Sequence, residues 1–169
     1  PGAPKLNFPR LRGLTLRHFS LYAKRKDELT VEFNDGVFCL AGANGLGKST
    51  FLNALNYGLT GRVPSSETTF ASDKEYYADS KNFVASYFTG RIHERDRKAA
   101  EVSIVMDVGE RTYTITRGIF DTDSLRELTI TRREKGKNKE AVELDTIKLS
   151  ASKRDAKYQE LLVRDIGLS

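Results

Sequence analysis

The sequence predicts an α/β fold in which a largely antiparallel β-meander packs around one strand and the helix that follows it. Two observations carry this prediction. A short apolar run at residues 37–41 leads into a glycine-rich loop, after which apolar residues recur at helical spacing. Two later stretches, residues 102–115 and 128–144, alternate apolar and polar side chains on either side of a turn, which is the pattern of a β-hairpin. At 169 residues, the chain suits one domain with its own core.

The first part of the chain predicts strands joined by turns. Residues 11–20 predict a first strand, and the alternation at residues 29–33 predicts a second strand that is half exposed to water. The turn signal at residues 34–36 leads into the apolar run 37–41, which we expect to be a buried strand. The cysteine of this run, Cys39, is expected to be a small buried hydrophobic residue.

Helices are predicted in three parts of the chain. The helix after the glycine-rich loop should end near Gly58 or Gly61, because glycine favours the left-handed backbone that terminates helices. The aromatic residues between 76 and 88 predict one or two short helices that pack in the core rather than stack on bases. A last helix is predicted to open at Ser152, where Asp155 would complete a capping box. The apolar face of this last helix would comprise Ala156, Leu161, Leu162 and Ile166.

A phosphate-binding loop is the most informative motif of the chain. The pattern G-x-x-x-x-G-K-[ST] is met in full at residues 42–49. Its glycines let backbone N–H groups point at phosphate oxygens, Lys48 places a charge on the β- and γ-phosphates, and Ser49 offers a hydroxyl to Mg²⁺. We therefore predict a nucleoside triphosphate site with Lys48 as its catalytic residue and Ser49 as a metal ligand. The predicted cofactor site comprises Gly42, Ala43, Asn44, Gly45, Leu46, Gly47, Lys48, Ser49 and Thr50.

Composition and charge restrict the classes of partner. Apolar content of 38% with 30% charged residues suits a soluble globular domain, and no run approaches the roughly 20 apolar residues of a membrane span. The net charge of +5 is unevenly distributed, and basic clusters of this kind suit a polyanion such as nucleic acid, with a merely solvated surface as the alternative. The clusters comprise Lys24, Arg25 and Lys26; Arg91, His93, Arg95, Arg97 and Lys98; and Arg132, Arg133, Lys135, Lys137 and Lys139.

The ends and the cysteine content add two expectations. Residues 1–9 begin Pro-Gly-Ala-Pro without methionine and are interpreted as a flexible tag remnant, so that residues 10–169 form the domain. No signal peptide is visible, and a single cysteine cannot form an internal disulfide, which fits a reducing cytoplasm.

Hydrolysis needs more than a phosphate loop, namely an acid that holds Mg²⁺ and a group that positions water. Asp107 is the local candidate for the acid, but the chain returns at once and favours a hairpin. Gln159 and His93 are expected on the surface, and no metal cluster is predicted. Because only one strand has the character of a parallel strand, we expect the chain to be the first half of a nucleotide-binding head, completed by a distant segment or another chain.

Four segments carry a family resemblance, namely residues 14–22, 44–50, 52–55 and 113–117. Through these segments the chain resembles the amino-terminal lobe of the SMC/SbcC/RecF group of ABC-type ATPases, including the β-meander of that lobe. Within this group, residues 87–91 and 117–120 are similar to bacterial SMC-like defence ATPases such as Lamassu.

This resemblance implies a split head whose two lobes are separated by a long coiled coil. The carboxy-terminal lobe would carry the signature motif, the Mg²⁺-binding acid and the catalytic glutamate, so that only the completed head hydrolyses ATP. Two heads, as a homodimer, would enclose two ATP molecules with Mg²⁺ and clamp double-stranded DNA in repair, chromosome maintenance or defence against foreign DNA. Kleisin or nuclease subunits would be further partners, a membrane would not, and a bacterial protein would be cytoplasmic and nucleoid-associated.

The resemblance also implies roles for single residues. Arg17 and His18 would contact the nucleotide, and Arg62 would lie near DNA or nucleotide. Two alternatives remain open: a RecF- or OLD-like head that gates a nuclease, and a nucleotide-dependent dimerisation switch without turnover. A transport ABC protein is disfavoured by the split organisation. The predicted DNA contacts comprise Arg62, Arg91, Arg95, Arg97, Lys98, Arg132 and Arg133.

Overall fold

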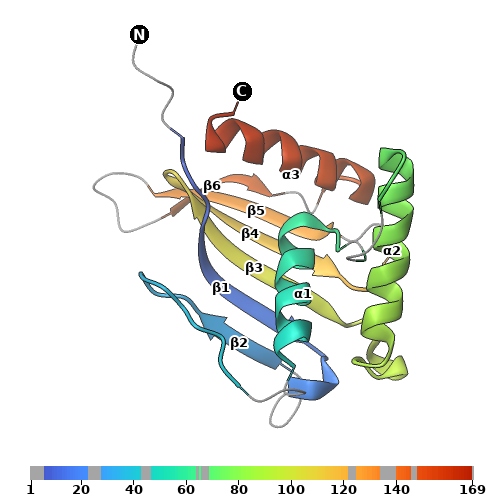
Figure 1. Ribbon diagram of the computed structural model, residues 1–169. Helices are drawn as coiled ribbons and strands as arrows, with labels where there is room; N and C mark the ends of the chain where they lie inside the picture. Colours follow the sequence, from blue (N-terminus) through green and yellow to red (C-terminus); the bar gives the residue numbers. More distant parts are fainter. Residues whose placement is uncertain are drawn as a thin grey trace.

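The fold is a six-stranded sheet with three α-helices and two short 3₁₀ turns (Figure 1). The computed structural model describes residues 6–22, 28–42, 47–63, 65, 69–121, 125–133, 140–145 and 148–168. In chain order the elements are β1 (Arg10–Arg17), η1 (Ser20–Tyr22), β2 (Glu28–Glu32), α1 (Lys48–Thr60), α2 (Asp73–Thr89), η2 (Glu94–Asp96), β3 (Glu101–Val108), β4 (Arg111–Gly118), β5 (Leu125–Arg133), β6 (Glu140–Asp145) and α3 (Ala151–Ile166).

The strands lie in the order β2-β1-β3-β4-β5-β6, and every neighbouring pair is antiparallel. The chain leaves the sheet after β2 to form α1 and α2, then returns to place β3 beside β1. In this register Leu14 lies opposite Val31 on one side and Ile104 on the other. The two predicted hairpins are confirmed as β3–β4 and β5–β6. The predicted antiparallel meander is therefore confirmed.

All three α-helices lie on one face of the sheet, with α1 over its middle and α3 over the β5 side (Figure 1). The alternate residues of the strands that point to this face form the core, in one cluster with α1 and α2 and a second with α3. The close seat of α1 depends on Gly58, because a Cβ there would lie 2.5 Å from Cδ1 of Ile104. Leu59 packs against both clusters and so joins them.

The end of α1 and the start of α2 carry the residues that commonly terminate and cap helices. Gly61, with φ of 71°, terminates α1 as predicted. Where one or two short helices were predicted, residues 73–89 form one helix of 17 residues, and Ser72 caps it by accepting a hydrogen bond from the backbone N–H of Glu75. The core placement of its aromatic residues is confirmed for Phe88, which is buried, whereas Tyr77 is 45% exposed.

The expected strand at residues 37–41 is not formed, although the predicted fold class is confirmed. These residues have no regular structure, and Cys39, predicted to be buried, is exposed. Val37 is fully exposed and Leu40 is 44% exposed, while Phe38 packs edge-on against Phe33. The physical reason is that an apolar run becomes a buried strand only beside a partner strand, and β2 pairs only with β1 in the described part of the chain.

The capping box predicted for α3 is also wrong. Ser150 is the N-cap residue, but its side chain accepts no capping hydrogen bond from the described residues, and Asp155 instead pairs with Arg117. The apolar face is correct for Leu161, Leu162 and Ile166, but Ala156 is exposed and Tyr158 fills the core position. At the other end of α3, Asn7 donates its backbone N–H to the carbonyl of Ile166 at 2.9 Å, so this residue of the expected tag remnant contacts the fold.

Candidate nucleotide-binding site

The two ends of the phosphate loop are described, while Ala43, Asn44, Gly45 and Leu46 lie outside the described residues. At the far end, Gly47 adopts φ of 85° and starts α1 without a side-chain cap. The first N–H groups of a helix have no partner within the helix, so they are free here to bind an anion. Nζ of Lys48 donates a hydrogen bond to the carbonyl of Gly42, which closes the loop at its base.

Tyr22 anchors the exit of the loop, a role that sequence reasoning missed. Its hydroxyl donates to the carbonyl of Gly47 at 2.6 Å, and the same carbonyl accepts the backbone N–H of Phe51 at 2.9 Å. Burial, and then the neighbouring Tyr87, raise the pKa of the Tyr22 phenol, which therefore stays a donor at neutral pH. Tyr22 comes from η1, so only the tertiary fold brings it to the loop.

Arg91 contacts the first turn of α1. Its Nε donates to Oγ1 of Thr50 at 3.1 Å, and its guanidinium lies 3.9 Å over the ring of Tyr87. The structure thus places Arg91, predicted to contact DNA, beside the phosphate loop and holds its side chain by three groups, since Nη1 also donates to the carbonyl of Tyr87.

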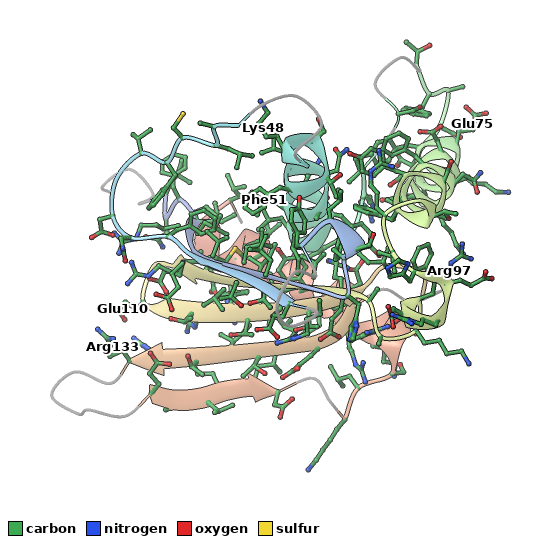
Figure 2. All side chains as sticks on the ribbon, turned by 90° about the horizontal axis from the view of Figure 1, so that it is seen from below. Lys48, Phe51, Glu75, Arg97, Glu110 and Arg133 are labelled. Atoms are coloured by element: carbon green, nitrogen blue, oxygen red, sulfur yellow. The ribbon has the colours of Figure 1, made fainter. Side chains whose placement is uncertain are left out.

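Lys48 and Ser49 stand at the start of α1, and Figure 2 shows Lys48 at the tip of the helix with Phe51 directed toward the sheet. The exposed hydroxyl of Ser49 is available to a cation. No group of three or more His, Cys, Asp or Glu side chains with metal-site geometry exists among the described residues. Asp107 pairs instead with Arg12 and accepts a hydrogen bond from Thr112, as its hairpin placement requires. Ser49 therefore fits Mg²⁺ as one ligand of a site that needs others.

The surroundings of Arg17 and His18 differ from the nucleotide contacts that the resemblance implies. The guanidinium of Arg17 bonds Glu28 at 3.0 Å and Glu101 at 2.5 Å, so a nucleotide contact would require these ion pairs to break. His18 adopts φ of 63°, a left-handed backbone that His tolerates better than most residues, and turns the chain out of β1. Its Nδ1 is buried, lies 4.0 Å from Asp96 and makes no hydrogen bond. Nucleotide contacts by these two residues remain predictions.

The residues predicted to contact DNA differ in whether their side chains pack on the protein or face solvent. Some are held by the protein: Arg62 lies 3.9 Å over the ring of Tyr77, and Arg97 lies 5.1 Å over that of Phe120. The others face solvent, although Arg132 is paired with Glu110 at 2.6 Å. The residues open to solvent are Arg95, Lys98, Arg132 and Arg133.

Two of the three basic clusters include described residues, and these two, 91–98 and 132–133, lie at opposite ends of the sheet, as Arg97 and Arg133 show in Figure 2. Arg97 precedes β3, whereas Arg132 is opposite Arg111, which pairs with the far end of β3. The first cluster therefore lies with the phosphate loop and the second far from it. Lys24, Arg25, Lys26, Lys135, Lys137 and Lys139 lie outside the described residues.

The fold and the loop together define a P-loop nucleotide-binding lobe. A family profile described as an AAA domain matches residues 14–166, so the chain belongs to this family. It is the amino-terminal lobe of an SMC/SbcC-like ATPase head.

The chain is also similar in sequence to a DNA repair protein. It is 34% identical over 91 residues to the DNA repair protein RAD50 of Drosophila melanogaster, a match that covers 53% of this chain and 6% of the relative. The chain thus corresponds to a small part of that relative. None of the helices among the described residues has the length and apolar character needed to cross a membrane.

Proposed function

We propose that this lobe binds ATP with Mg²⁺ and that ATP drives engagement of two heads around DNA. The observation that carries the proposal is the geometry at the base of the phosphate loop. There the ammonium group of Lys48 donates a hydrogen bond to the carbonyl of Gly42, and the first turn of α1, which has no side-chain cap, follows the left-handed Gly47. An ammonium group and free N–H groups converge there, which suits the oxygens of a triphosphate.

We propose a carboxy-terminal lobe as the partner that completes the head. The support is the exposed apolar run of Val37, Phe38 and Leu40, which directly precedes the phosphate loop. Contiguous exposed apolar side chains of this kind mark an interaction surface. The same lobe would supply the acid that joins Ser49 around Mg²⁺ and the groups that activate water, so hydrolysis would require it.

DNA is the proposed polyanionic partner, and Arg95 and Lys98 are its best-supported contacts. Arg95 has 81% of its side chain exposed, and Lys98 is exposed three residues further on; both follow Arg91, which bonds Thr50 in the first turn of α1. Contacts between such cations and phosphates would make binding independent of sequence and weaker at high salt. The RAD50 relative is named a DNA repair protein, and that name favours repair over defence as the pathway.

The test is Lys48→Ala in the protein that carries both lobes. ATP binding by calorimetry should weaken at least about a hundredfold, because the β- and γ-phosphates lose their cationic side chain. ATP-dependent dimerisation, followed by light scattering, should disappear with it. Glu160→Gln, on the exposed face of α3, is the control and should change neither measurement. ATP binding that is unchanged in Lys48→Ala would falsify the proposal.

Turnover separates this function from a switch. If the assembled heads bind ATP and dimerise but never release phosphate, the lobe serves as a nucleotide-dependent dimerisation switch. Release of phosphate that depends on Lys48 supports the ATPase.

A further inference from the structure

Thr50 and Ser49 are neighbours in the first turn of α1, but their hydroxyls have different surroundings. Ser49 is exposed, whereas Thr50 is 3% exposed and turned into the protein. Oγ1 of Thr50 accepts a hydrogen bond from Nε of Arg91 and lies 3.4 Å from the hydroxyl of Tyr87. The side chain that follows the phosphate-loop serine is therefore fixed by Tyr87 of α2 and by Arg91, which follows α2.

Arg91 is itself held in one orientation. Its guanidinium stacks on the ring of Tyr87, and Nη1 donates to the carbonyl of Tyr87. Its backbone carbonyl accepts hydrogen bonds from both the N–H and the Oγ of Ser20, at 2.9 and 2.7 Å. Because its planar fork and its backbone are both fixed, Arg91 can hold Thr50 with little loss of side-chain freedom.

The charge at this place favours an anion. The N-terminus of α1 carries a partial positive charge, and the guanidinium of Arg91 adds a full one close to it. No carboxylate of the described residues pairs with Arg91 within 4 Å. The helix N-terminus and the Arg91 guanidinium repel each other when no anion is present. Phosphate oxygens that bind between or beside them would be attracted by both positive groups.

We infer that Arg91 is a positioning residue of the nucleotide site, which fixes the first turn of α1 through the Thr50 hydroxyl and so strengthens ATP binding. The inference rests on the proposed function, because it assumes that the ligand of the loop is ATP. It also changes the role of Arg91 from a DNA contact to a support of the phosphate loop.

A double-mutant cycle tests the inference in the protein that carries both lobes. The variants are Arg91→Ala, Thr50→Val and the combination, with Thr50→Ser to restore the hydroxyl and Lys74→Ala to remove an exposed positive charge from α2, the helix that precedes Arg91. Calorimetry with ATP and Mg²⁺ measures affinity, and thermal unfolding without nucleotide measures stability. Arg91→Lys replaces Arg91→Ala if the latter does not fold, because lysine lacks the fork that joins Tyr87 to Thr50.

We expect Arg91→Ala and Thr50→Val each to weaken ATP binding about tenfold, as for the loss of one charge-assisted hydrogen bond. The combination should bind no more weakly than the weaker single variant, because both remove the same contact. Thr50→Ser and Lys74→Ala should bind as the parent does.

Two results overturn the inference. One is an Arg91 variant that binds ATP as tightly as the parent. The other is a combined variant in which the two losses multiply, since Arg91 would then act independently of Thr50. Either result differs from failure of the proposed function, in which the parent protein binds no ATP or Lys48→Ala binds it equally well.

Discussion

At the scale of single residues, Gly47 shows how the fold adds to a sequence motif. The motif requires glycine here so that the backbone can approach phosphate. The structure adds two further reasons, a left-handed φ of 85° and the hydroxyl of Tyr22, which would lie 2.8 Å from a Cβ. A side chain at this position would therefore disturb the protein before any nucleotide arrives.

Gly47→Ala should lower the free energy of unfolding by about 1–2 kcal/mol from the left-handed backbone alone, with a further loss from the contact with Tyr22. The matched control is the same substitution in a Tyr22→Ala background, which keeps the left-handed backbone of residue 47 and removes the hydroxyl that would lie 2.8 Å from the Cβ. Urea unfolding should show a larger loss for Gly47→Ala in the parent than in the Tyr22→Ala protein. Equal losses in the two backgrounds would refute the role of Tyr22.

Arg17, His18 and Arg91 mark the limit of sequence reasoning about the site. The phosphate loop was predictable because its chemistry lies in consecutive residues. The partners of Arg17 are Glu28 and Glu101, and those of Arg91 come from α1 and η1. Such contacts depend on which elements are neighbours in space, and no local pattern encodes them.

At the scale of elements, the C-terminal end of α1 shows how its last carbonyls are satisfied. The carbonyl of Tyr57 accepts the N–H of Gly61, that of Gly58 accepts Nε of Arg117, and that of Leu59 accepts the hydroxyl of Tyr158. A cation is favourable at this end of a helix dipole. The phosphate-loop helix is thus bonded at its far end to both β4 and α3.

Arg117 is the centre of this junction, because its side chain is 1% exposed and pairs with Asp155 at 2.8 Å. Asp155→Asn should lower the free energy of unfolding by about 2 kcal/mol, less than for a fully buried pair because Asp155 is partly exposed to water. Glu160→Gln, in a surface pair with Lys157 on the same helix, should change it by less than about 0.5 kcal/mol. Chemical unfolding compares the two variants, and similar small effects would contradict the importance of the junction.

Elements with local signals were predicted well, and those that depend on a distant partner were not. The hairpins and the end of α1 at Gly61 follow from alternation and glycine. The run 37–41 has the hydrophobicity of a buried strand, but hydrophobicity does not say whether a partner strand is present. Asp155 has the spacing of a capping box, but the buried Arg117 binds it instead.

At the scale of the whole molecule, the exposed apolar run and the two solvent-facing basic clusters occupy different parts of the surface. The run of Val37, Phe38 and Leu40 lies beside the phosphate loop in the chain, and the clusters of Arg95 and of Arg133 lie at opposite ends of the sheet. One short stretch of DNA contacted by a single lobe would therefore meet one cluster, not both.

The apolar run provides a test of the second lobe. The double substitution Phe38→Glu and Leu40→Glu should abolish co-purification of the separately expressed carboxy-terminal lobe, because two charges would be buried without partners. Val142→Glu, on the edge strand β6 where Val142 is 64% exposed, is the matched control and should leave co-purification intact. Gel filtration of the mixed lobes gives the measurement, and an intact complex with the first variant would place the interface elsewhere.

The pairing of β1 with β3 joins strands that are far apart in the sequence, and this separation affects the order in which the strand pairs of the sheet form. The strands β3 to β6 follow one another through short connections, whereas Arg17 of β1 meets Glu101 only after the segment that holds the phosphate loop has been synthesised. Closing that long loop carries an entropic penalty that the tight hairpins avoid. The phosphate loop thus lies within the long segment that closes when β1 pairs with β3, and we expect this pairing to form more slowly than the hairpins.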